Sequence, residues 1–402
     1  MMVSREENMP NPPIAPWPSF TAEEQAAVSR VLASNRVNYW TGDEGRVFEC
    51  EFAKWTGTEY AIALANGTVA LDLALHALKI GPGDEVIVTP RTFIASISTV
   101  VNAGATPVFA DVDQDSGNIS AATIEPAITD RTRAIIPVHL GGWPCDMSAI
   151  MALAKQHDLF VIEDCAQAHG AMVGNHMVGS LGHIGAWSFC QDKIMTTGGE
   201  GGMVTTNDRD LWSRMWSFKD HGKSWEAVYE RQHTPGFRWL HESFGTNWRM
   251  IEMQAAVGRI QLLRMEEWTK RRTEIAHRYY KMLRSFANSV RVPLPAEGFT
   301  HAYYRFYAYV KPSGLRPGWS RDRIVAEVNA LGAPLFHGSC SEVYLEKAFD
   351  GTGVRPATPL ANAHQLGETS LMFLTHPTMT EADVERVCAA TSQVLIEAST
   401  GG

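Results

Sequence analysis

Short apolar runs alternate with helical patterns through the first half of the chain. We predict strands at Glu85–Thr89, Pro107–Asp111, Ala134–Val138, Leu159–Asp164, Ala186–Phe189 and Gly202–Thr205. Neighbouring positions in these runs are apolar, so both faces of each strand are expected to be buried. Helical patterns fall between most of the runs, which is typical of a largely parallel sheet with helices on both sides. We therefore predict an α/β fold.

A leucine stripe predicts a helix that begins at Gly67–Thr68. Leu71, Leu75 and Leu78 follow at spacings of four and three residues. These spacings place all three side chains on one helix face, where they can pack on the sheet.

The pattern changes in the second half of the chain. A helical stretch rich in Arg and Glu runs from Arg249 to about Leu283 and is interpreted as a spacer. It is followed by a predicted aromatic strand at Tyr303–Val310 and predicted helices at Ser320–Leu331 and Thr380–Glu397. We therefore divide the chain into a lead-in (residues 1–19), a large domain (20–285, including the spacer at about 249–283) and a smaller C-terminal α+β domain (286–402). Thr21 and Glu24 have the spacing of a capping box, so a helix is expected to follow the lead-in.

Charge and cysteine placement narrow the class of protein. The 402 residues include 35 Lys and Arg against 44 Asp and Glu, a formal net charge of −9. A nucleic-acid binder needs a basic face, so this balance argues against one. Six scattered cysteines without a CxxC pair favour reduced thiols over a disulfide framework or zinc site. No segment suits a signal peptide or a membrane span, so we expect a cytoplasmic protein without a membrane partner.

Asn66-Gly67-Thr68 stands at the predicted start of the leucine-striped helix. Free backbone N–H groups and the positive end of the helix dipole suit a phosphate at this place. Gly67 would allow the phosphate to come close to the backbone, and Thr68 would offer it a hydroxyl group. A simple helix cap, which is the commoner case for such a tripeptide, remains the alternative.

Asp164 ends an apolar strand, where open α/β sheets place their ligands. Its carboxylate could pair with a protonated pyridine nitrogen, although capping of the next helix is equally open. Gln167 could donate to a phenolate oxygen on the same ring. His169 either packs near that ring or is a core histidine.

Lys193 follows the strand Ala186–Phe189 and precedes the glycine-rich turn 198–202. A lysine that alternates between imine and free amine needs a partly desolvated position. Ser188, five residues earlier, could hold a phosphate. Most lysines are solvated surface charges, so only the surrounding pattern favours a chemical role here.

A loop at Gly245–Met250 is followed by a helix start with small residues at 254–258. This segment could contribute to a site or serve stability only. The sequence has no HExxH, CxxC or GxSxG motif, which argues against a metal site and against a serine hydrolase.

Taken together and in this order, the segments resemble the DegT/DnrJ/StrS aminotransferase family. The matching stretches are Asn66–Leu71, Gly81–Val112, Val161–Gly170, Ala186–Met203 and Gly245–Gly258. The resemblance covers most of residues 20–280. It implies the fold-type I architecture of pyridoxal 5'-phosphate (PLP) enzymes, with a mostly parallel seven-stranded sheet covered by helices and a smaller C-terminal α+β domain.

The resemblance also implies residue roles. Lys193 and Asp164 would be catalytic, with Lys193 forming the Schiff base with PLP and Asp164 pairing with the pyridine nitrogen. The other cofactor-binding roles would fall to Gln167 at the ring oxygen, to Gly67, Thr68 and Ser188 at the phosphate, to Phe93 on the ring face, and to Asn247 at the phosphate of the neighbouring subunit. The active sites would then be shared within a homodimer.

The activity implied is ping-pong transfer of an amino group from L-glutamate to the keto group of a nucleotide-diphosphate sugar, in amino-sugar or polysaccharide biosynthesis. Some relatives that dehydrate sugars have histidine in place of the lysine, so Lys193 favours transamination. The alternatives are amination of a cyclitol or carbocyclic ketone, or a non-catalytic regulator or sugar sensor. Weaker substrate candidates are His337, and Arg238 and Trp239 near the Asn247 loop. An arginine there could bind a diphosphate in bidentate fashion.

Overall fold

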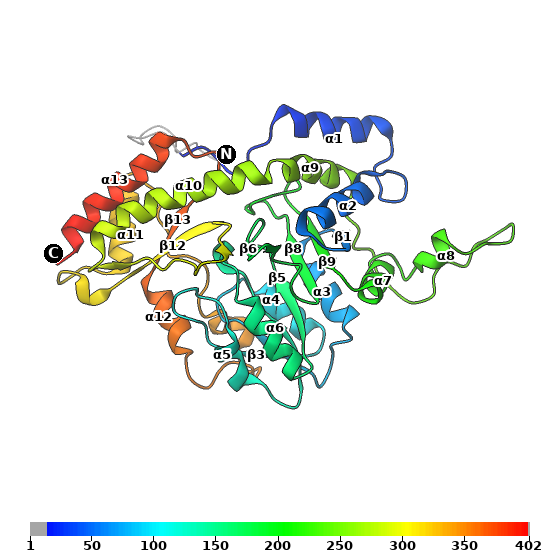
Figure 1. Cartoon of the computed structure of the whole chain (residues 1–402), viewed down its shortest axis with the longest axis horizontal. Coiled ribbons are helices and arrows are strands. Elements are labelled where there is room, and N and C mark those ends of the chain that lie inside the picture. Colours follow the sequence, from blue (N-terminus) through cyan, green and yellow to red (C-terminus); the bar gives the residue numbers. More distant parts are fainter. Residues whose placement is uncertain (1–13, 401–402) are drawn as a thin grey trace.

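The computed structural model describes residues 14–400 and confirms the α/β fold (Figure 1). Its centre is a seven-stranded sheet in the order β1-β9-β8-β5-β4-β2-β3. The strands are β1 (Tyr60–Leu64), β2 (Glu85–Val88), β3 (Thr106–Phe109), β4 (Thr132–Ile136), β5 (Phe160–Asp164), β8 (Ile184–Ser188) and β9 (Gly202–Thr206). β9 is antiparallel to both neighbours, and the other pairs are parallel. The six predicted strands are all present, and β1 is the strand of this sheet that the sequence analysis missed.

Helices cover both faces of this sheet. They are α2 (Glu44–Thr56), α3 (Gly67–Ala77), α4 (Ala95–Asn102), α5 (Ala121–Ile124), α6 (Met147–Gln156) and α7 (Arg209–Phe218). α1 (Ala22–Ser34) packs instead on the helix at Glu252–Leu263. Successive strand residues enter different clusters, since Ile135 packs with α6 and Ile136 packs with α3. This alternation explains why the strands are apolar at neighbouring positions.

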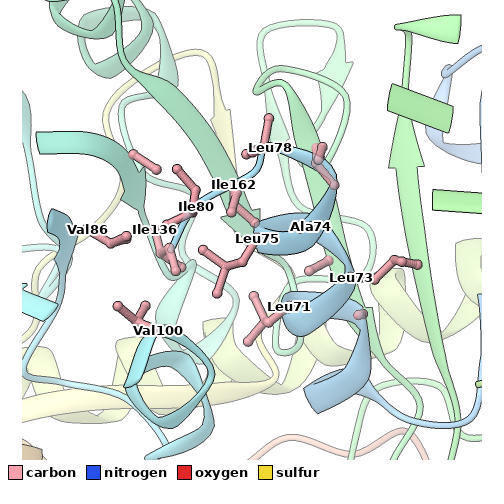
Figure 2. Close-up of a cluster of buried hydrophobic side chains, with 14 of the residues drawn as sticks. Leu71, Leu73, Ala74, Leu75, Leu78, Ile80, Val86, Val100, Ile136 and Ile162 are labelled. Atoms are coloured by element: carbon pink, nitrogen blue, oxygen red, sulfur yellow. The ribbon is translucent and has the colours of Figure 1, made fainter. Parts of the chain in front are cut away.

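The leucine stripe on α3 faces the sheet as predicted. Leu71, Leu75 and Leu78 are buried, and Figure 2 shows the first two among Ile136 and Ile162. α3 begins where Asn66 caps it, so the packing of this stripe also fixes the position of the helix N-terminus.

α1 begins at the predicted capping box, in which the Thr21 side chain accepts from the Glu23 N–H and Glu24 bonds back to Thr21. The same helix receives a second anchor from the middle of the chain. The Arg264 guanidinium lies 2.7 Å from a Glu24 carboxylate oxygen and 2.6 Å from one of Glu23.

The prediction of one continuous spacer helix is wrong. The segment is two helices, α9 (Glu252–Leu263) and α10 (Met265–Leu283), that meet at Arg264. The two helices pack on different surfaces, because α9 lies on α1 and α2 whereas α10 contributes Tyr279 and Leu283 to the core of the C-terminal part. Residues 249–251 are not helical, and Arg249 instead pairs with Leu64 at the end of β1.

The C-terminal part is a smaller α+β unit. Its antiparallel sheet has the order β10 (Val290–Arg291), β12 (Arg305–Val310) and β13 (Ser370–Leu374), and α10, α11 (Arg321–Ala330) and α13 (Glu381–Ala398) contribute to its core. A third sheet joins β11 (Phe299–Thr300), β6 (Met172–Val173) and β7 (His176–Met177). The segment that follows α11 returns to the large unit, where Tyr344 and Phe349 enter the α3 cluster and α12 (Ala361–Thr369) enters the α6 cluster. Of the lead-in 1–19, residues 1–13 lie outside the described part.

Residues 220–247, which we call the arm, leave the body next to α7. The arm carries α8 (Trp225–Tyr229) and is joined at its base by bridges between Asp220 and Asn247 and between Lys223 and His241. Figure 1 shows it projecting away from both units. Within residues 14–400, no helix is both long and apolar enough to cross a bilayer.

The packing of α3 gives a direct test of the fold. Leu75 is fully buried, so replacing it with Ala should lower the free energy of unfolding by about 2–5 kcal/mol. Denaturant unfolding followed by circular dichroism measures this change. Leu263→Ala is the matched control, because Leu263 is 86% exposed and the same substitution there should cost less than about 0.5 kcal/mol. Equal effects of the two substitutions would contradict the described core.

Candidate active site

A cavity of about 580 Å³ lies at the carboxyl ends of the central strands. β1, β5 and β8 run in the same direction, so their carboxyl ends meet at one edge of the sheet, where open α/β folds bind ligands. The cavity brings together seven of the predicted site residues: Gly67, Thr68, Phe93, Asp164, Gln167, Ser188 and Lys193.

The N-terminus of α3 and the end of β8 form a cradle on one side of the cavity. The Asn66 side chain accepts the Val69 N–H at 3.0 Å, and the helix has no acceptor for its first N–H groups, at Gly67 and Thr68. A methyl group on Gly67 would lie 2.6 Å from Cβ of Ser188, so only glycine permits this approach. Free N–H groups, a helix dipole and a serine hydroxyl together suit a phosphate group.

Asp164 lies at the floor of the cavity and is almost fully buried. Its two oxygens accept the Ser96 hydroxyl at 2.8 Å and the Ala166 N–H at 3.1 Å. Burial raises the pKa of Asp164, although these hydrogen bonds and the charge of Lys193 oppose the rise. A cationic group placed against this carboxylate would offset the cost of burying its charge.

A second buried carboxylate, Glu163, fixes the end of β5 from the opposite face. Its oxygens accept three backbone N–H groups from residues 179–182 at 2.6–2.9 Å and contact Nε2 of His139 at 3.1 Å. Nδ1 of His139 accepts the Cys145 N–H, so Nε2 carries the hydrogen and donates to Glu163. These contacts hold the strand that presents Asp164. The sequence analysis did not single out Glu163, Ser96 or His139.

The Lys193 amine reaches the cavity from the loop after β8. Nζ lies 3.2 Å from an Asp192 carboxylate oxygen and 5.5 Å from the centre of the Tyr304 ring, and the side chain is only 17% exposed. The Trp17 indole donates to the Lys193 carbonyl at 2.8 Å, which anchors the loop backbone. The amine therefore has the partly desolvated position that the sequence analysis predicted. Asp192 and Tyr304 were missed there.

Two further predicted residues border the cavity. Phe93 is 70% exposed and leaves an aromatic face available for stacking. The Gln167 side-chain oxygen accepts the Gly141 N–H at 2.7 Å, so its amide hydrogens remain free for a ligand.

His169 is a core residue. It is fully buried, with ring centres 5.1 Å from Trp187 and 5.6 Å from Phe189. Burial lowers the pKa of His169 to about 3, so the ring is neutral. Of the two interpretations left open by the sequence, the structure supports core packing.

Four predicted residues lie apart from the cavity of their own chain. Asn247 is exposed at the base of the arm, and Arg238 and Trp239 are exposed just before the Lys223–His241 bridge. His337 lies in a separate groove beside α11, where Nε2 is 3.3 Å from an Asp322 carboxylate oxygen. Their roles stay predictions.

The residues around the cavity fit PLP. The cradle that glycine leaves open at Ser188 suits its phosphate, the buried Asp164 carboxylate suits a protonated pyridine nitrogen, and the Lys193 amine suits its aldehyde. Phe93 and Gln167 would contact the ring between these points.

Comparison with known proteins agrees with this fit. The family model for the DegT/DnrJ/EryC1/StrS aminotransferases matches residues 18–392. GDP-perosamine synthase of Caulobacter vibrioides is 40% identical over 364 residues, which cover 89% of this chain and 92% of that protein. A dTDP-3-amino-3,4,6-trideoxy-alpha-D-glucose transaminase of Streptomyces venezuelae is 37% identical, with 84% and 83% covered.

A solved structure gives the same result. The aminotransferase from Psychrobacter cryohalolentis superposes with a TM-score of 0.95 at 62% identity, covering 96% of this chain and 99% of that one. The chain therefore belongs to the DegT/DnrJ/EryC1/StrS aminotransferase family and is a PLP-dependent transaminase.

Proposed function

We propose that the protein transfers an amino group from L-glutamate to the keto group of a nucleotide-diphosphate sugar, with Lys193 and Asp164 as its catalytic residues. The observation that carries the proposal is the single cavity that holds the Lys193 amine, the Asp164 carboxylate and the α3–Ser188 cradle. The nucleotide-sugar substrate is supported by the names of the two relatives described above, one of which makes a GDP-linked and the other a dTDP-linked amino sugar.

Each part of the cavity has a defined task in this proposal. The α3 N-terminus and Ser188 bind the cofactor phosphate, and Asp164 keeps the ring nitrogen protonated. When bound, PLP withdraws electrons from the carbon that loses a proton. Lys193 takes that proton at Nζ and so acts as a general base. When the same steps run in reverse on the keto sugar, Lys193 gives a proton back as a general acid.

The arm supports a homodimer with shared active sites. Phe237, Trp239 and Phe244 are 77%, 80% and 99% exposed, and such a group of exposed aromatic side chains marks an interaction surface. We propose that the arm lies across a second copy of the chain, where Asn247 binds the phosphate and Arg238 binds the substrate diphosphate. Unpaired cysteines agree with a cytoplasmic enzyme.

Substitution of Lys193 tests the chemistry. Lys193→Ala should lower turnover by at least about a hundredfold and abolish the long-wavelength cofactor absorbance, because the general base and the amine that joins the aldehyde are both lost. The assay incubates glutamate with a panel of nucleotide-linked keto sugars and detects amino sugars by mass spectrometry. Lys155→Ala on the exposed side of α6 is the control and should behave as wild type. Full activity of Lys193→Ala would refute the assignment.

Substitution of Gly67 tests the phosphate cradle. A Cβ at Gly67 would push against Ser188, so Gly67→Ala should weaken PLP binding by about tenfold or more. Equilibrium titration of the cofactor-free protein, followed by absorbance, measures the affinity. Gly81→Ala is the matched control, because the nearest atom to its Cβ is 3.7 Å away. Unchanged affinity in Gly67→Ala would place the phosphate elsewhere.

Substitution of Trp239 tests the arm. Trp239→Ala should weaken dimerisation by roughly tenfold or more, because large aromatic residues dominate interface energies. Sedimentation over a range of protein concentrations measures the dissociation constant. Phe336→Ala removes an exposed aromatic side chain outside the arm and should leave the constant unchanged. A wild-type protein that sediments as a monomer would exclude the shared site.

A further inference from the structure

Lys193 must spend part of each reaction cycle as a free amine, and a free ammonium in a partly buried cavity needs a negative partner. Three carboxylates line this cavity, Asp164, Asp192 and Glu200. In the proposed function, Asp164 pairs with the protonated ring nitrogen of the cofactor, and its oxygens also accept from Ser96 and Ala166. Asp192 is the carboxylate in direct contact, 3.2 Å from Nζ.

The C-terminal unit holds Asp192 in this position. The Tyr304 hydroxyl donates to the Asp192 oxygen that does not face Lys193, at 2.5 Å. The guanidinium of Arg305 lies 4.1 Å from the centre of the Tyr304 ring, and its Nη2 is 3.5 Å from the Tyr304 hydroxyl. Because the Asp192 side chain is about half exposed, it could turn toward solvent if the Tyr304 hydroxyl did not fix it.

The protonation states suit this arrangement. Burial by itself would raise the pKa of Asp192, but the charge of Lys193 and the contacts of Tyr304 and Arg305 hold it below its ordinary value. Burial raises the pKa of Tyr304 far above its ordinary value, so Tyr304 remains a neutral donor. The titratable or charged groups around Lys193 and Asp192 are Asp164, His169, Tyr304 and Arg305. Of these, His169 is neutral. Glu200 lines the same cavity.

We propose that Asp192 is the counter-ion of Lys193 whenever Lys193 is not joined to the cofactor, and that Tyr304 is a positioning residue that holds Asp192 for this task. The contact favours the state in which Lys193 is free and its amine protonated. Asp192 therefore shifts the balance between the two cofactor forms of the enzyme. The meaning of this inference rests on the proposed function, in which Lys193 is the cofactor lysine.

The first test uses the cofactor-free full-length protein and an acetylating ester as the probe. The neutral Nζ attacks the ester carbonyl, an N–C bond forms, the alcohol part leaves, and the proton goes to solvent. Peptide mass spectrometry gives the acetylation rate of Lys193 at neutral pH and at an alkaline pH where every variant has a neutral amine. The rate at neutral pH is divided by the rate at alkaline pH. This ratio removes differences between variants in how easily the ester reaches Lys193.

Asp192→Asn should increase this ratio at Lys193 by about two- to fivefold, as expected for losing one partly exposed ion pair. Tyr304→Phe should change it in the same direction by a smaller factor, and Asp192→Glu, which keeps the charge, should stay near wild type. Lys155 in the same digest is the internal control, and Asp350→Asn, which breaks an exposed pair with Arg355, is the control variant. An unchanged ratio in Asp192→Asn would overturn the proposal, as would an equal change at Lys155.

The second test uses the loaded enzyme and the donor half-reaction alone. Asp192→Asn should lower the equilibrium constant for conversion by glutamate, the direction that frees Lys193, by a similar two- to fivefold factor. Absorbance titration with glutamate and 2-oxoglutarate measures this constant. If the constant does not move, Asp192 has no part in the cycle. These results are independent of the Lys193→Ala experiment. Full activity of Lys193→Ala would show that Lys193 takes no part in the reaction.

Discussion

A carboxylate buried at the carboxyl end of β5 is the constraint on which the rest of the site depends. Asp164 is removed from water, and burial raises the cost of its charge. The hydroxyl of Ser96 and the N–H of Ala166 satisfy its oxygens but supply no positive charge. In the proposed function, the basic ring nitrogen of the cofactor would supply that charge, so the cost of burying Asp164 would favour binding of such a ring.

The position of Asp164 is set from both sides of the sheet. On the side of the cavity, Ser96 at the start of α4 donates a hydrogen bond to Asp164. Behind, the neighbouring Glu163 accepts hydrogen bonds from His139 and from the turn at 179–182. Alternation along a strand sends the two carboxylates to opposite faces. One therefore serves the fold and the other serves the cavity, although they are adjacent in the sequence.

Much of the fold could be predicted from the sequence, because doubly buried strands and the α3 leucine stripe leave strong periodic signals. β1 was missed although Ala61–Leu64 is apolar, and the break at Arg264 was missed because helix periodicity continues through it. The break follows from tertiary packing, which a local pattern does not contain. Most of the residues proposed to bind the cofactor could be selected from the sequence because they stand at strand ends and a helix start. Tyr304 could not, since only the fold brings it beside Asp192, 112 positions away.

The hydrogen bond from Trp17 to the Lys193 carbonyl gives the first described residues an unexpected importance. The Trp17 ring also stands edge-on to Trp268 at 5.0 Å, so the indole is held by α10 while it holds the lysine loop. Trp17 does not line the cavity, yet it helps to fix the loop that carries Lys193. A change in the described chain ahead of α1 is therefore expected to act on the Lys193 loop through a single indole N–H.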